Sequence, residues 1–115
     1  MAGEEGKKMS GAFEEREDTF EKRFANDEAL RFRAVVRRNK AVALWAAEMK
    51  GLSPEAAEKY AEDFVGAEVG ASDNDVAAAL KKDLARAGVD LSDHRLLKKM
   101  AEAMAEAAAS VKAGR

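Results

Sequence analysis

The stretch KGLSPE, residues 50–55, decides how the chain folds, because it ends one helix and starts the next. A glycine that directly follows a helical pattern commonly adopts the left-handed conformation that ends a helix, and Gly51 is placed for this role. Ser53 is a favoured N-cap, and Pro54 suits the first helical position, where its missing N–H leaves no hydrogen bond unmade. The sequence therefore predicts one helix that ends near residue 50 and another that begins at 54.

The same pattern, a helix-ending glycine followed by an N-cap serine, recurs twice further along the chain. Gly70 precedes the N-cap Ser72, and Gly88 precedes the N-cap Ser92. Apolar side chains between these signals recur with the period of an amphipathic helix, and the last stripe includes Leu96, Leu97, Met100 and Met104. The pattern predicts three helices after the first, over residues 54–69, 73–87 and 93–113.

Composition agrees with a small all-α protein. The chain has 115 residues, which fits one domain, and its 26 alanines, many Glu, Lys, Leu and Arg and few β-branched residues favour helices. With no cysteine, disulfides and sulfur-ligated metals are excluded. No apolar run is long enough to cross a membrane or to form a signal peptide, so we expect a cytoplasmic protein without direct membrane insertion.

The first helix carries an apolar stripe that runs back from Met49 through Trp45 and Val35 to Phe13. A helix from 13 to 50 would be about 57 Å long, whereas the other predicted helices are about 22 to 31 Å. Asp27 interrupts the stripe at a plausible N-cap, which gives a shorter helix over 27–50. We therefore expect an all-α fold, a four-helix bundle over 27–113, preceded by a mobile N-terminal segment, residues 1–26.

That segment carries an apolar ridge with no core of its own. Phe13, Phe20 and Phe24 are spaced seven and four residues apart, and charged side chains flank them: Arg16, Glu17, Glu21 and Arg23. A narrow ridge of this kind is suited to a groove on another protein. Alternatively, the ridge packs on its own bundle, extends the first helix into solvent, or joins two copies of the chain.

A basic stretch in the first helix is the second candidate site. Arg31, Arg33, Arg37, Arg38 and Lys40 lie within ten residues that contain no acid, while residues 53–75 carry seven acids and one base. The bases either pair across a helix contact with the acids of the helix over 54–69, which are Glu55, Glu58, Glu62, Asp63 and Glu68, or hold an anion such as an adenine nucleotide, with Trp45 as a stacking wall. Because the bases surround the helix and the neighbouring segment is acidic, nucleic-acid binding is disfavoured.

The sequence offers little for catalysis. His94 is the only histidine, and no serine or second histidine lies at a meaningful spacing from it. The acidic pairs lack the mixed histidine and carboxylate spacing of metal sites. We therefore expect no enzyme activity, no metal and no cofactor.

From Phe13 onward the chain resembles the zeta family of ATP synthase inhibitor subunits of alphaproteobacteria. The residues that carry the resemblance are the pair Arg16-Glu17, Phe20-Glu21, Phe24-Ala25, Asp27-Glu28, Phe32, the block Arg37-Arg38-Asn39-Lys40, and Leu44-Trp45-Ala46-Ala47-Glu48 followed by Gly51-Leu52. The chain departs from the family pattern in its longer stretch 1–12 and in Ala43, where glycine is expected.

The resemblance implies a four-helix bundle whose N-terminal segment orders as a helix when it inserts at a catalytic interface between the alpha and beta subunits, near the gamma subunit. Such a wedge blocks ATP hydrolysis but permits synthesis. It further implies a protein that is monomeric when free and lies at the inner face of the plasma membrane when bound to the ATP synthase. The phenylalanines of the ridge become the groove anchors, and the four charged residues beside them become rim contacts.

Overall fold

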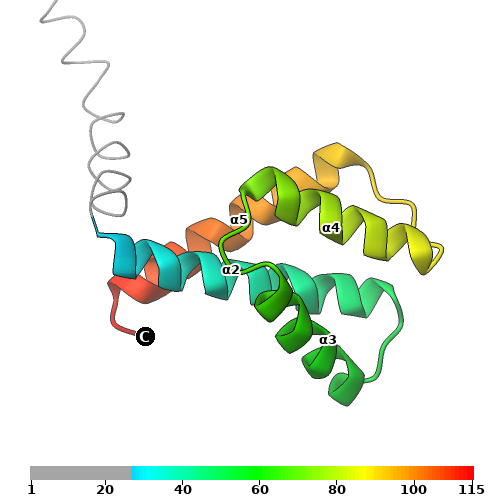
Figure 1. Cartoon of the computed structure of the whole chain (residues 1–115), viewed down its shortest axis with the longest axis horizontal. Helices are drawn as coiled ribbons and strands as arrows, with labels where there is room; N and C mark the ends of the chain where they lie inside the picture. The colour runs from blue at the N-terminus through cyan, green and yellow to red at the C-terminus, as the bar shows by residue number, and fades with distance from the viewer. Residues whose placement is uncertain (1–26) are drawn as a thin grey trace, which may run out of the picture.

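The computed structural model describes residues 27–115, and this part of the chain consists of four helices and their connections (Figure 1). The helices are α2 (Glu28–Met49), α3 (Pro54–Ala67), α4 (Asp73–Arg86) and α5 (Asp93–Lys112). Each one begins and ends within two residues of the predicted bounds. The all-α class and the four helices are confirmed.

Side-chain caps start every helix where the sequence predicts them. The side chains of Asp27, Ser53, Ser72 and Ser92 each accept a hydrogen bond from the backbone N–H three residues on, at 3.1 to 3.3 Å. At the other end of α4, Gly88 has φ +79° and the Val89 N–H donates to the Leu84 carbonyl at 2.9 Å. This is a Schellman-type end at the predicted glycine, whose conformation allows the chain to reverse.

Helix α2 is the central element of the bundle. It packs against α3 and α5 along much of its length and more briefly against α4, which also contacts α5. In Figure 1, α3 crosses α2, whereas α5 runs back along it, so that the end of α5 lies beside the start of α2. A hydrogen bond of 2.7 Å from Arg37 Nη1 to Ser110 Oγ joins these two ends.

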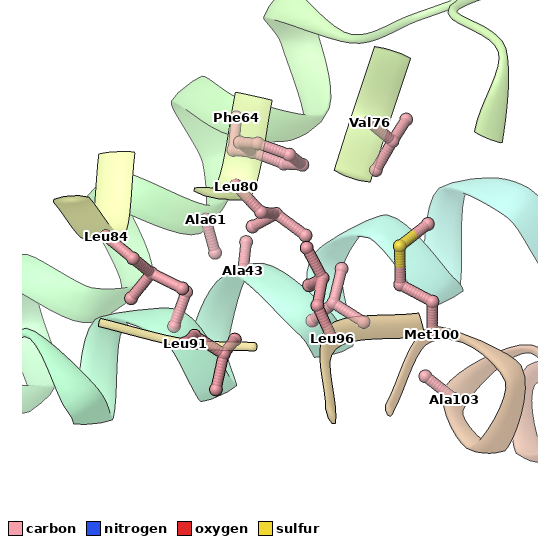
Figure 2. Packing of buried hydrophobic residues seen from close by; sticks show 12 residues of the cluster. Ala43, Ala61, Phe64, Val76, Leu80, Leu84, Leu91, Leu96, Met100 and Ala103 are labelled. Carbon is pink, nitrogen blue, oxygen red and sulfur yellow. The ribbon is translucent and has the colours of Figure 1, made fainter. Parts of the chain in front are cut away.

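The main core fills the space where all four helices meet. Leu80 of α4 is fully buried and lies among Phe64 of α3, Ala43 of α2 and Leu96 of α5 (Figure 2). A smaller cluster at the start of α2 joins Ala34 to three residues of α5, Ala107, Ala108 and Val111. Alanines line both contacts, and their small side chains let the helices approach closely.

One residue of the predicted apolar stripes lies outside this core. Leu97 of α5 is 53% exposed, whereas its neighbour Leu96 is buried. The expectation that Leu97 belongs to the buried stripe is wrong, because α2 and α4 cover only one side of this turn of α5. None of the helices formed by residues 27–115 combines the length and the apolar character needed to cross a membrane.

Candidate functional site

The first predicted site cannot be located in the fold. Its residues, Phe13, Arg16, Glu17, Phe20, Glu21, Arg23 and Phe24, lie outside the described residues. The described chain begins at Asp27, whose backbone is extended with φ −114° and ψ 93°. The bundle thus starts with a capped helix directly after the predicted inhibitory segment.

The second predicted site, the basic stretch of α2, is dispersed over several contacts. Arg33 is exposed, and Trp45 is partly buried with the Lys99 ammonium 5.8 Å from its ring centre. Lys40 pairs with Glu58 of α3 at 3.6 Å, as the pairing prediction requires. Arg37 donates to Ser110 and to the main-chain oxygen of Arg115 at the end of α5. These bases do not converge on one pocket, and adenine-nucleotide binding stays a prediction.

Arg38 is the exception among the bases because it is buried, with 3% exposure. Its Nε donates to Asn39 Oδ1 at 3.0 Å, and its Nη1 donates to Asp73 Oδ1 at 2.9 Å at the start of α4. Asn39 is also buried, whereas the Asp73 side chain is 76% exposed. The sequence predicts a partner on the helix over 54–69, but this guanidinium ties α2 to α4 instead.

Next to this pair the structure has a groove of about 350 Å³, between the first half of α2 and the connection from α3 to α4. Its apolar lining consists of Phe32, Val35, Val36, Val65, Val69 and Ala71. Its charged lining consists of Arg31, Glu68 and Asp73. Two carboxylates and one guanidinium disfavour a phosphate group, so the groove suits an apolar side chain better than a nucleotide.

Sequence reasoning missed this groove. Phe32 and Val69 lie off the buried stripes of their segments and are 54% and 59% exposed. A large apolar residue between two arginines, Arg31 and Arg33, is the signal that could have singled out Phe32. Nothing in the local pattern of either residue indicates that the two line one groove, because this depends on how α3 crosses α2.

A half-buried polar pair joins α3 to α4. The Tyr60 hydroxyl of α3 donates to Asp83 Oδ2 of α4 at 2.8 Å. Burial raises the pKa of Tyr60 well above its usual value of about 10, and the hydrogen bond and negative charge of Asp83 raise it further. The Lys50 ammonium lies 3.9 Å from the centre of the Tyr60 ring. The pair stabilises the α3–α4 contact and has no group nearby that suggests chemistry.

These observations define a small helical bundle protein with a groove of mixed apolar and charged lining, in which residues 27–115 gather no metal site. The class is that of small all-α proteins built from four short helices. The family model for ATPase inhibitor subunit zeta matches residues 9–110, and the chain belongs to this family. Searches of the curated proteins and of the solved structures found no match.

The family gives the chain an inhibitory role towards an ATPase. The match begins at residue 9, so it includes the whole phenylalanine ridge as well as the bundle. The family confirms the predicted resemblance.

Proposed function

We propose that this chain inhibits ATP hydrolysis by the F-type ATP synthase by inserting residues 13–24 as a helix at an alpha/beta catalytic interface. Phe13, Phe20 and Phe24 anchor the helix in an apolar groove of that interface. Arg16, Glu17, Glu21 and Arg23 contact its rim. The insertion lies near the gamma subunit, so that rotation in the direction of hydrolysis tightens the wedge and rotation in the direction of synthesis expels it.

The observation that carries the proposal is the family match to a segment that lies before the bundle. The match includes residues 9–26, whereas the two apolar clusters of the described chain draw on residues between Leu30 and Val111. Asp27 caps α2 through its side chain, 3.1 Å from the Leu30 nitrogen. Within residues 27–115 the bundle therefore has its own start and its own core, which supports the assignment of the ridge to a partner.

The free energy of insertion requires contacts from the bundle as well as from the ridge. Burying three phenylalanines contributes about 1.5 to 3 kcal/mol each, or about 5 to 9 kcal/mol together. Ordering the twelve residues from 13 to 24 costs about 1 to 2 kcal/mol per residue, which is larger. Backbone hydrogen bonds, the rim contacts and additional contacts from the bundle must supply the difference. We therefore expect the isolated segment to bind more weakly than the whole chain.

The experiment compares two polar substitutions in the full-length chain. Phe20→Ser removes the central anchor, and Leu97→Ser is the matched control because Leu97 is exposed on α5 and lies outside both the ridge and the groove. Loss of one buried phenylalanine should raise the concentration for half-inhibition of the cognate ATPase about 10- to 150-fold. The control should leave it unchanged.

The same titration separates the parts of the proposal. If the full chain does not inhibit hydrolysis by its cognate ATPase, the proposed function is wrong. If the chain inhibits but Phe20→Ser acts like Leu97→Ser, the inhibition does not depend on the ridge, and the assignment of the site is wrong. Thermal unfolding of both variants should stay close to that of the parent chain, because Leu97 is exposed and neither change alters a residue of the two apolar clusters within residues 27–115.

A further inference from the structure

We propose that the groove between α2 and the α3–α4 connection binds the phenylalanine ridge of the same chain when no ATPase is bound. This self-contact would hold residues 13–24 against Phe32 and Val69. The groove and the ATPase would then compete for residues 13–24. The regulatory consequence rests on the proposed function. The contact itself does not, and the two are tested separately below.

The first argument is the apolar surface that the groove leaves uncovered. Three large apolar side chains of residues 27–115 are more than half exposed: Phe32 at 54%, Val69 at 59% and Leu97 at 53%. Two of the three, Phe32 and Val69, line the same groove, with Val35, Val36 and Val65 beneath them. Adjacent exposed apolar groups in a hollow indicate a binding surface, whereas single ones such as Leu97 are ordinary.

The second argument is where the remaining chain enters the bundle. The described part begins at Asp27, only a few residues before the groove residues Arg31 and Phe32. Asp27 is extended and caps α2, so the helix begins there and the residues before it need not continue along its axis. Three residues, 25–27, separate Phe24 from the first helical residue, and connections of two to eight residues are usual between antiparallel helices. The ridge can therefore fold back along the first half of α2.

The third argument is charge. The groove presents one base, Arg31, and two acids, Glu68 and Asp73. Within residues 27–115 no side-chain hydrogen bond or ion pair engages Arg31 or Glu68. The ridge carries acids and bases on its flanks, Glu17 and Glu21 with Arg16 and Arg23. Each charge of the groove thus has an opposite charge within reach on the segment.

A weak contact is enough for an effect because the two parts are joined by a short connection. Short linkers give effective concentrations of about 1 mM. A self-contact with an intrinsic dissociation constant of about 0.1 to 1 mM would then occupy about half to nine-tenths of the molecules. The ATPase would meet a correspondingly smaller free fraction, which weakens apparent inhibition about 2- to 10-fold.

The contact is tested first without the ATPase. The chain has no cysteine, so Ala67→Cys places a single spin label at the end of α3, beside the groove residue Glu68. In the full-length chain the label should broaden the amide signals of residues 13–24, and Phe20→Ser with Phe24→Ser should abolish the broadening. Absence of broadening in the parent chain would overturn the proposal. Broadening of an unlabelled ¹⁵N chain mixed with labelled chain would overturn it in favour of a second copy.

The consequence is tested with the cognate ATPase. Phe32→Ser with Val69→Ser removes the exposed apolar groups of the groove, and Leu97→Ser is again the control. The groove variant should inhibit at a 2- to 10-fold lower concentration than the parent chain, and the control should not differ. Weaker inhibition by the groove variant would show that the groove binds the ATPase and would overturn the self-contact. If no form of the chain inhibits, the proposed function fails, while the spin-label result still decides the contact.

Discussion

The substitution Leu80→Ala tests whether the four helices depend on one common core. Leu80 is fully buried, and its cluster contains residues of α2, α3 and α5 as well as of α4. The change removes three carbons, which at about 0.8 kcal/mol for each accounts for about 2.4 kcal/mol. A cavity walled by several helices closes poorly, which adds to this loss, so we expect a total of about 3 to 5 kcal/mol.

This loss is large relative to the stability of the fold. A domain of this size has a free energy of unfolding of about 4 to 13 kcal/mol, so Leu80→Ala would remove about a quarter of it or more. The midpoint of thermal unfolding should fall by at least about 10 °C, at about 4 to 8 °C for each kcal/mol. The assay is urea unfolding followed by circular dichroism at 222 nm, which reports all four helices together.

Leu97→Ala is the matched control, because it removes the same three carbons from a leucine that is 53% exposed. Alanine is also the better helix former, so the expected change is within about 0.5 kcal/mol of zero. Equal losses in the two variants would refute the reasoning, since the stability would then not depend on the burial that the structure assigns to Leu80. Two separate unfolding transitions in the parent chain would refute it as well.

Three further substitutions test local features of the bundle. Tyr60→Phe removes the hydrogen bond to Asp83 and should cost about 0.5 to 1.5 kcal/mol at pH 8. Because the folded state raises the pKa of Tyr60, this contribution is present below pH 10 and is lost as the pH rises further. The difference in free energy of unfolding between the parent chain and Tyr60→Phe should therefore shrink between pH 10 and pH 12. A constant difference would contradict the explanation by burial and the hydrogen bond to Asp83. Gly88→Ala forces a side chain into φ +79° and should lower the free energy of unfolding by about 1 to 2 kcal/mol, whereas Gly66→Ala, in open space within α3, should raise it by up to about 1 kcal/mol. Thermal unfolding that shifts in the same direction for both glycine variants would contradict the assignment.

The helices of the bundle could be predicted from the sequence because their boundaries are local signals. Ser53, Ser72 and Ser92 each accept a hydrogen bond from a residue three positions on, and a glycine ends the preceding helix in each case. Such signals act within one turn of the chain and need no tertiary contact. The partners of the basic stretch could be predicted only in part, since Lys40 pairs with Glu58 but Arg38 pairs with Asp73.

The rest could not be predicted because it depends on how the helices cross. Leu96 and Leu97 are adjacent and equally apolar, yet only the packing of α5 decides that the first is buried and the second exposed. The groove brings Phe32 together with Val69, which is far away in the sequence. Periodicity describes one helix at a time, and a hollow between two helices is a property of neither alone.

The cap at Asp27 has a consequence for how inhibition and stability respond to substitution. Because α2 begins at its own N-cap and the core described within residues 27–115 forms among the four helices, changes at the ridge should alter inhibition more than unfolding, and changes such as Leu80→Ala should alter unfolding first. Inhibition and stability would become coupled through the groove. If the ridge folds back onto Phe32 and Val69, it binds the folded bundle and so stabilises it, and by linkage a change on the groove side that weakens this self-contact makes the bundle slightly less stable while it makes the chain a better inhibitor. Groove residues would then tune inhibition without touching the ATPase.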